Sequence, residues 1–123
     1  MIHVAELERS IAFYQLLGFE IGNYMPRSGP MHWAWLYAPQ AADWKRGPNL
    51  MLTRSVRAID ASAQDVLFYL YAENLASLRG SLLVKGVNAG AIGYPDYLPD
   101  GECRLEDPDG YVLMLAQSAA DTP

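Results

Sequence analysis

Cysteine, basic charge and long apolar runs are scarce in this sequence, and each shortage argues against a class of protein. Cys103 is the only cysteine in 123 residues, so no disulfide can form within the chain, and we expect a cytoplasmic protein. The formal net charge of −5 argues against a nucleic-acid partner, because such binding requires a basic face. No apolar run reaches the ~18 residues of a membrane span, and the N-terminal residues lack the features of a signal peptide. We therefore expect neither a nucleic acid nor a membrane as partner.

Familiar catalytic motifs are missing as well. The sequence contains no Gly-x-Ser-x-Gly nucleophile motif, no phosphate-binding glycine loop and no paired cysteines. Cys103 lies among apolar neighbours in a predicted strand, which favours an inert buried thiol over a nucleophile. What remains is the composition of a folded domain, with 51% hydrophobic and 19% charged residues and a length that fits a single domain over 1–123.

Strand and helix patterns occur in the same order in two halves of the chain. Each half begins with a strand and continues with an amphipathic helix that ends at a glycine. In the first half we predict strands at 2–5, 19–24, 32–37 and 50–53, a helix at 6–17 and a helical turn at 41–45. In the second half we predict strands at 66–71, 87–91, 102–105 and 111–117, a helix at 74–85 with Asn74 as N-cap, and a frayed tail at 119–123.

The two halves also match in two details. The helix and its terminal glycine have the same length, from Glu6 to Gly18 and from Asn74 to Gly86, and each half closes with Leu-Met-Leu. We interpret the chain as two βαβββ modules, about 1–54 and 65–117, joined by a polar linker at 55–64.

Two motifs near the ends of the chain carry a resemblance to a known family. They are Val4 to Tyr14 followed by Leu17-Gly18-Phe19, and Glu106-Asp107-Pro108-Asp109-Gly110-Tyr111 before the last strand. Together they resemble the glyoxalase/bleomycin resistance/dioxygenase superfamily, also called vicinal oxygen chelate proteins. The resemblance implies a bacterial protein with an α+β fold, in which two modules form curled mixed sheets around a cavity. It also implies a homodimer, because halves from different chains often face each other in this family.

Many members of that superfamily bind a divalent metal at four equivalent strand positions. By the resemblance, the first position falls ahead of Met1, and the others fall on Met51, near Leu67 and on Met114. Methionine is a poor ligand for hard or borderline cations, and the two histidines do not make a site by themselves. We therefore expect no metal, no cofactor and no catalytic residue.

Ligand contacts are expected from residues that face the cavity. Met51 and Met114 occupy two of the metal positions and should face inward, and by alternation His3 shares a strand face with the first metal position. The alternatives are a pair of core methionines and a surface histidine. Tyr69 and Tyr71 alternate with the position near Leu67 and should also face inward.

Three further residues complete the predicted site. Trp33 and Trp35 share one face of their strand with Tyr37, and the sequence leaves open whether that face lines the cavity. Arg104 either pairs with Glu102 or Glu106 or binds an anion. Acidic residues near the second half's loops add negative potential or are simply solvated: Asp96, Asp100, Glu102 and Glu106.

This site predicts a metal-free small-molecule binding protein of the bleomycin-resistance type. It would confer antibiotic resistance by sequestering a drug-like or cationic aromatic ligand in an aromatic-lined cavity. The enzyme alternative is a glyoxalase- or dioxygenase-like lyase or isomerase with a displaced metal site, which the lost ligands disfavour. A regulatory module with a vestigial cavity is a third reading, and the sequence does not separate it from the first.

Overall fold

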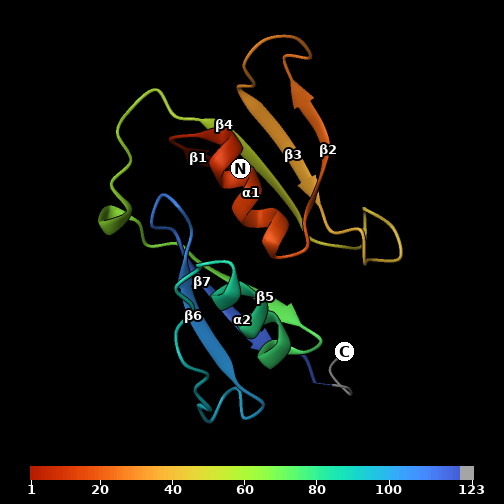
Figure 1. Ribbon diagram of the computed structural model, residues 1–123, viewed down its shortest axis with the longest axis vertical. Coiled ribbons are helices and arrows are strands. Elements are labelled where there is room, and N and C mark those ends of the chain that lie inside the picture. The colour runs from red at the N-terminus through yellow and green to blue at the C-terminus, as the bar shows by residue number, and fades with distance from the viewer. Residues whose placement is uncertain (120–123) are drawn as a thin grey trace. The chain divides into compact units, whose positions relative to one another are not determined.

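The computed structural model describes residues 1–119, so most of the tail predicted at 119–123 lies outside the described residues. The chain divides into two compact units, unit 1 (Met1–Ala61) and unit 2 (Ser62–Pro123). Each unit combines one α-helix with one small mixed sheet, which confirms the α+β prediction (Figure 1). Within residues 1–119, no helix is long and apolar enough to cross a membrane.

Unit 1 is a four-stranded sheet with a helix on one face. Its elements are β1 (Ile2–Val4), α1 (Leu7–Leu16), β2 (Glu20–Met25), β3 (Trp33–Tyr37) and β4 (Asn49–Arg54). The strand order is β1-β4-β3-β2, in which β1 runs parallel to β4 and the other neighbours are antiparallel. Leu52 of β4 pairs with Ile2 and with Ala34, and all three are buried on the face that α1 covers.

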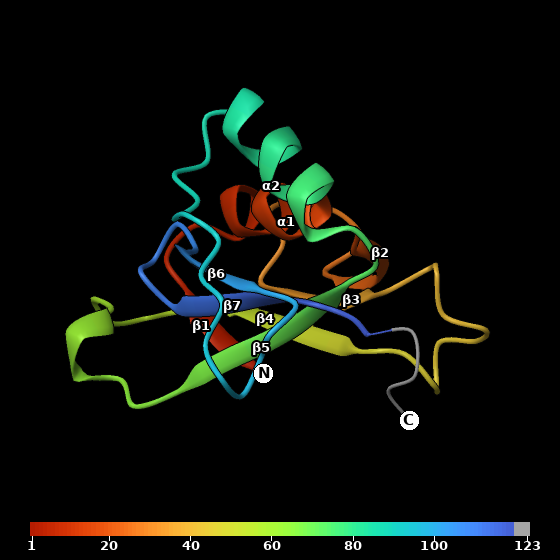
Figure 2. The same cartoon turned by 90° about the horizontal axis from the view of Figure 1, so that it is seen from below.

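Unit 2 repeats this plan with one strand fewer. Its elements are β5 (Leu67–Ala72), α2 (Leu75–Val84), β6 (Glu102–Glu106) and β7 (Val112–Gln117), in the sheet order β5-β7-β6. A short 3-10 helix, Ala61–Ala63, lies in the predicted linker. Figure 2 shows α2 on one face of its own sheet, and residues 62–119 supply no second α-helix for the other face.

Side-chain caps hold α2 at its beginning. Asn74 is the N-cap, as predicted, and its side chain accepts a 3.0 Å hydrogen bond from the Ser77 amide. Gln117 on β7 accepts from the Leu75 amide at 2.8 Å and donates to the Glu73 carbonyl at 2.6 Å. The start of the helix is therefore tied directly to the central strand of the sheet.

Glycines end both helices, as the sequence predicts. Gly18 follows α1 with φ of 97° and Gly86 follows α2 with φ of 84°, a conformation that favours glycine. The predicted turn at 107–110 also forms, because the Asp107 carboxylate accepts hydrogen bonds of 2.9 Å from the amides of Asp109 and Tyr111.

Two predicted elements are wrong. Residues 87–91 are not a strand: the Gly90 amide donates to the Arg104 carbonyl, and Gly93 forms an isolated bridge with Glu102, but no continuous ladder develops. Residues 41–45 form turns rather than helix, because the Asp43 side chain accepts from the amides that follow it. Both helices are also shorter than predicted by one residue at each end.

Candidate functional site

The strand register of unit 1 places the predicted ligand residues of this unit on one face. Trp35 pairs with Met51, and Trp33 pairs with Thr53, which in turn pairs with His3. Residues paired across a sheet point to the same side, and Ala34 between the tryptophans is fully buried on the opposite side, beneath α1. The tryptophan face is therefore the one that α1 does not cover.

A bulge in β2 makes room for the Trp35 ring. The β2–β3 register shifts between Ile21 and Asn23, so Gly22 is the extra residue. A Cβ atom at Gly22 would collide with the six-membered ring of Trp35. The indole therefore lies directly over the backbone of Gly22, in a position that only glycine permits.

Two more aromatic rings pack against this indole. The Tyr37 ring stacks on Trp35 with centroids 5.7 Å apart and an interplanar angle of 23°. The Trp44 ring meets Trp35 edge-on at 5.5 Å and 84°. Both are arrangements that aromatic pairs favour.

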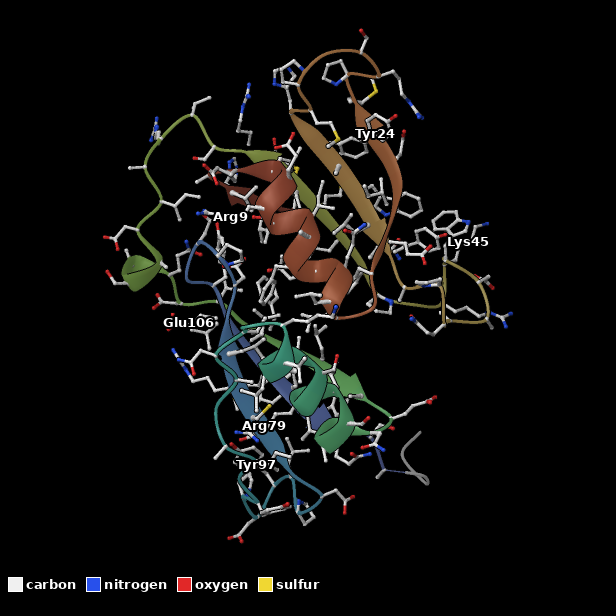
Figure 3. All side chains as sticks on the ribbon, viewed as in Figure 1. Arg9, Tyr24, Lys45, Arg79, Tyr97 and Glu106 are labelled. Carbon is white, nitrogen blue, oxygen red and sulfur yellow. The ribbon has the colours of Figure 1, made fainter. Side chains whose placement is uncertain are left out.

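The loop between β3 and β4 supplies Trp44, and side-chain hydrogen bonds shape this loop. Asp43 accepts from the amides of Lys45 at 2.8 Å and Arg46 at 3.2 Å. The Asn49 side-chain Nδ2 donates to the backbone carbonyls of Trp44 at 2.9 Å and Gly47 at 3.0 Å. Figure 3 shows Lys45 on this loop, and its ammonium lies 5.5 Å from the centroid of the Trp44 ring.

Together these side chains form an open groove of about 740 Å³ on unit 1. Its size is within the range of small-molecule pockets, about 300–1,000 Å³. The lining combines residues from β2, β3, β4 and the β3–β4 loop: Ile21, Gly22, Asn23, Trp33, Trp35, Tyr37, Trp44 and Met51. His3 lies on the same face of the sheet but does not line the groove.

Sequence reasoning did not name five of the lining residues as ligand contacts, two of which are aromatic: Ile21, Gly22, Asn23, Tyr37 and Trp44. Tyr37 shares the strand face of Trp33 and Trp35, so alternation alone could have included it. Trp44 carries no comparable signal, because its place depends on the hydrogen bonds that fold the loop around it.

The register of unit 2 gathers its four predicted ligand residues on one face too. Tyr69, Met114 and Arg104 form a row across β5, β7 and β6, and Tyr71 lies in the next row with Ala116 and Glu102. Leu115 and Cys103, which alternate with these residues, are buried on the side of α2.

The two carboxylates on this face, Glu102 and Glu106, have different hydrogen-bond partners. Arg104 forms an exposed 3.0 Å ion pair with Glu106 rather than with Glu102. Glu102 is buried, with 8% of its surface exposed, and its Oε1 accepts a 2.8 Å hydrogen bond from the Tyr97 hydroxyl. Hydrogen bonding to Glu102, and then to Tyr69, raises the pKa of Tyr97 to about 12.

The residues present do not fit the divalent metal that the fold family often carries. Met51 and Met114 occupy central-strand positions on the uncovered faces, where thioethers offer weak donors to such cations. No three His, Cys, Asp or Glu side chains within residues 1–119 gather into a metal-binding group. The Nδ1 atom of His32 lies 2.9 Å from the Arg54 guanidinium, so this histidine has a structural partner.

Cys103 matches the expectation of an inert thiol. It is 1% exposed on the helix side of β6, and burial raises its thiol pKa, which disfavours the reactive thiolate.

No protein-family model and no curated protein matches this chain. Solved structures do match its fold over almost the full length. A bleomycin resistance determinant encoded on the transposon Tn5 has a TM-score of 0.70 and 21% identity, with 95% of this chain and 92% of that chain covered. A bleomycin-binding protein complexed with bleomycin has a TM-score of 0.70 and 21% identity, over 96% and 94% of the two chains. An antibiotic-binding protein from a Streptomyces species has a TM-score of 0.70 and 19% identity, over 96% and 93%.

This likeness identifies the class of fold. The chain has the vicinal oxygen chelate fold, which is the fold that the sequence motifs at its two ends implied.

Proposed function

We propose that this protein binds a small drug-like molecule with a planar aromatic group, and that it confers resistance by sequestering that molecule. The observation that carries the proposal is the aromatic groove of unit 1, where Trp35 is held between Gly22, Tyr37 and Trp44. Structural neighbours that bind bleomycin or another antibiotic support the same class of function.

The groove suits a planar aromatic ligand for energetic reasons. Its rings are already packed against one another, so a ligand gains contact area without ordering mobile side chains. An aromatic pair contributes about 0.5–1.5 kcal/mol beyond burial, and a cation over an aromatic face adds a comparable amount. The net charge of −5 favours cationic over anionic ligands, and salt should weaken this attraction.

The test is a titration of bleomycin-like glycopeptides and smaller aromatic cations against wild type and Trp35→Ala. Loss of one stacking partner should weaken binding roughly twofold to twelvefold, at about 1.4 kcal/mol per factor of ten. Tyr24→Leu is the matched control, because Tyr24 pairs with Ala34 on the opposite face of the same sheet. Tyr69→Ala and Tyr71→Ala examine unit 2 in the same way. Equal affinity of wild type and Trp35→Ala for every compound that binds would contradict the groove assignment.

We also infer that the protein is a homodimer. Each sheet leaves apolar side chains exposed on the face opposite its helix, among them Met51, Leu67 and Tyr71. Exposed apolar surface of this kind favours association, and a two-fold dimer covers the same patch on both copies. Sedimentation at micromolar concentration should give twice the 13.6 kDa mass of the chain, and a monomer alone would count against the dimer.

A further inference from the structure

The Glu102 carboxylate of unit 2 is incompletely satisfied. Its Oε1 accepts from Tyr97, but its Oε2 is buried and has no hydrogen-bond partner within residues 1–119. A carboxylate only accepts hydrogen bonds, and burying an acceptor without a donor is unfavourable. Such an oxygen therefore favours any donor that can reach it.

Tyrosine side chains flank this carboxylate on the uncovered face of the sheet. Glu102 and Tyr71 lie in one row across the sheet, with Ala116 of the middle strand between them. Tyr97, whose hydroxyl donates to Glu102, also lies near enough to Tyr69 for that residue to raise its pKa. The Tyr97 hydrogen bond thus places one aromatic side chain against the carboxylate, and carboxylates and aromatic faces both attract positive charge.

The hydroxyl that donates to Glu102 Oε1 belongs to a side chain that is weakly held by packing. Tyr97 lies in the loop that leads into β6 (Figure 3), and 68% of its side chain is exposed. Its hydroxyl hydrogen bond to Glu102 is consequently a large part of what keeps the ring in place. A ligand group that binds Glu102 more strongly can move this ring aside at small cost.

The cation on the same strand and face as Glu102 is engaged elsewhere, because Arg104 donates to Glu106 at 3.0 Å. The negative charge of Glu102 is therefore left for a cation from outside the chain.

We infer that Glu102 is the binding site for a protonated amine of the small-molecule ligand. The ammonium group donates to Oε2, and the rings of Tyr69, Tyr71 and Tyr97 stabilise its charge. This inference rests on the proposed ligand-binding function and deepens it, because it names the group that the protein recognises and the residue that recognises it.

The experiment compares two probes of the same shape, 1-naphthylmethylamine and the neutral 1-naphthylmethanol, by calorimetric titration near pH 7. Wild type should prefer the amine by about tenfold, the scale of a charge-assisted hydrogen bond. Glu102→Gln should abolish this preference while leaving the affinity for the alcohol unchanged, since the amide oxygen can still accept from Tyr97. Glu106→Gln is the control, because it removes a carboxylate from the same strand and face and should keep the preference.

A second variant guards against misfolding of Glu102→Gln. Tyr97→Phe keeps the ring and the carboxylate but removes the competing hydroxyl, so its preference for the amine should equal or exceed that of wild type. An unchanged preference in Glu102→Gln, or its loss in Tyr97→Phe, would overturn the inference.

The two proposals fail in distinguishable ways. If the glycopeptides bind wild type and Trp35→Ala weakens them, but the amine and the alcohol bind wild type equally, the ligand-binding function stands and the amine site is wrong. If neither these probes nor the glycopeptides bind wild type, both the ligand-binding function and the amine site are wrong.

Discussion

The two sheets share a scaffold and differ in the chemistry of the face that no helix covers. Both central strands carry Leu-Met-Leu, with the methionine, Met51 or Met114, on the uncovered face. On unit 1 the methionine is next to Trp35 in an aromatic groove, whereas on unit 2 it lies between Tyr69 and Arg104. The helix side is constrained by packing, so the difference shows that the uncovered side of this scaffold is free to vary in chemistry.

The first prediction uses the two faces of the same strands. Leu52→Ala and Leu115→Ala remove side chains that are 0% and 1% exposed, and each should cost about 2–5 kcal/mol of unfolding free energy. Met51→Ala and Met114→Ala lie on the uncovered faces and should each cost less than about 1 kcal/mol. Urea unfolding monitored by circular dichroism measures all four. Equal costs for leucine and methionine would refute the assignment of faces.

The second prediction removes the space that distinguishes the groove of unit 1. Gly22→Ala forces the Trp35 ring away from β2 and should cost about 1–3 kcal/mol, the usual penalty of overpacking. It should also shift the tryptophan fluorescence and lower the affinity of the groove for aromatic ligands. The control is Gly80→Ala in α2, where a Cβ meets no atom within 4 Å and should stabilise the helix by about 0.5–1 kcal/mol. If Gly22→Ala left stability, fluorescence and ligand affinity unchanged, the position of the Trp35 indole would not depend on the bulge.

The third prediction concerns the proton on Tyr97 in unit 2. The folded chain holds this phenol with a pKa of about 12 against an ordinary value of 10.0, chiefly through its hydrogen bond to Glu102. Below pH 10 the phenol is protonated in folded and unfolded chains, so the contribution of this bond to stability is fully present. Between about pH 10 and about 12 only the unfolded chain ionises, and that contribution is lost.

Ultraviolet absorbance of phenolate measures this effect. Wild type should show one tyrosine titrating near pH 12 that is missing from Tyr97→Phe, and Glu102→Gln should lower the pKa of that tyrosine. The same high-pH step in Tyr97→Phe would assign it to a different residue.

Much of the fold follows from local signals in the sequence. Alternation predicts the faces of β3, β5 and β7, and Gly18, Gly86 and Asn74 mark helix ends because their roles depend on backbone geometry within a few residues. The strand predicted at 87–91 is wrong because pairing along a sheet edge requires partners that local pattern does not reveal.

The site is less accessible to sequence reasoning. Trp33, Trp35 and Met51 could be placed on one face from alternation once their strands were identified. Trp44 could not, since the conformation of its loop depends on Asp43 and Asn49 acting together. For Glu102 the sequence leaves open whether the charge adds negative potential to the site or is simply solvated, because its burial depends on a loop that pairs with the first residue of its strand.

The missing fourth strand of unit 2 has a kinetic consequence. In unit 1, β3 is hydrogen-bonded along both sides, whereas the outer side of β6 is contacted by Gly90 and Gly93 at separate points. Amides on that outer side should exchange with deuterium through local openings that cost much less than global unfolding. Cys103 lies in the same strand, so its thiol should become accessible to alkylating reagents in those transient openings, before unit 1 loses its own protected amides.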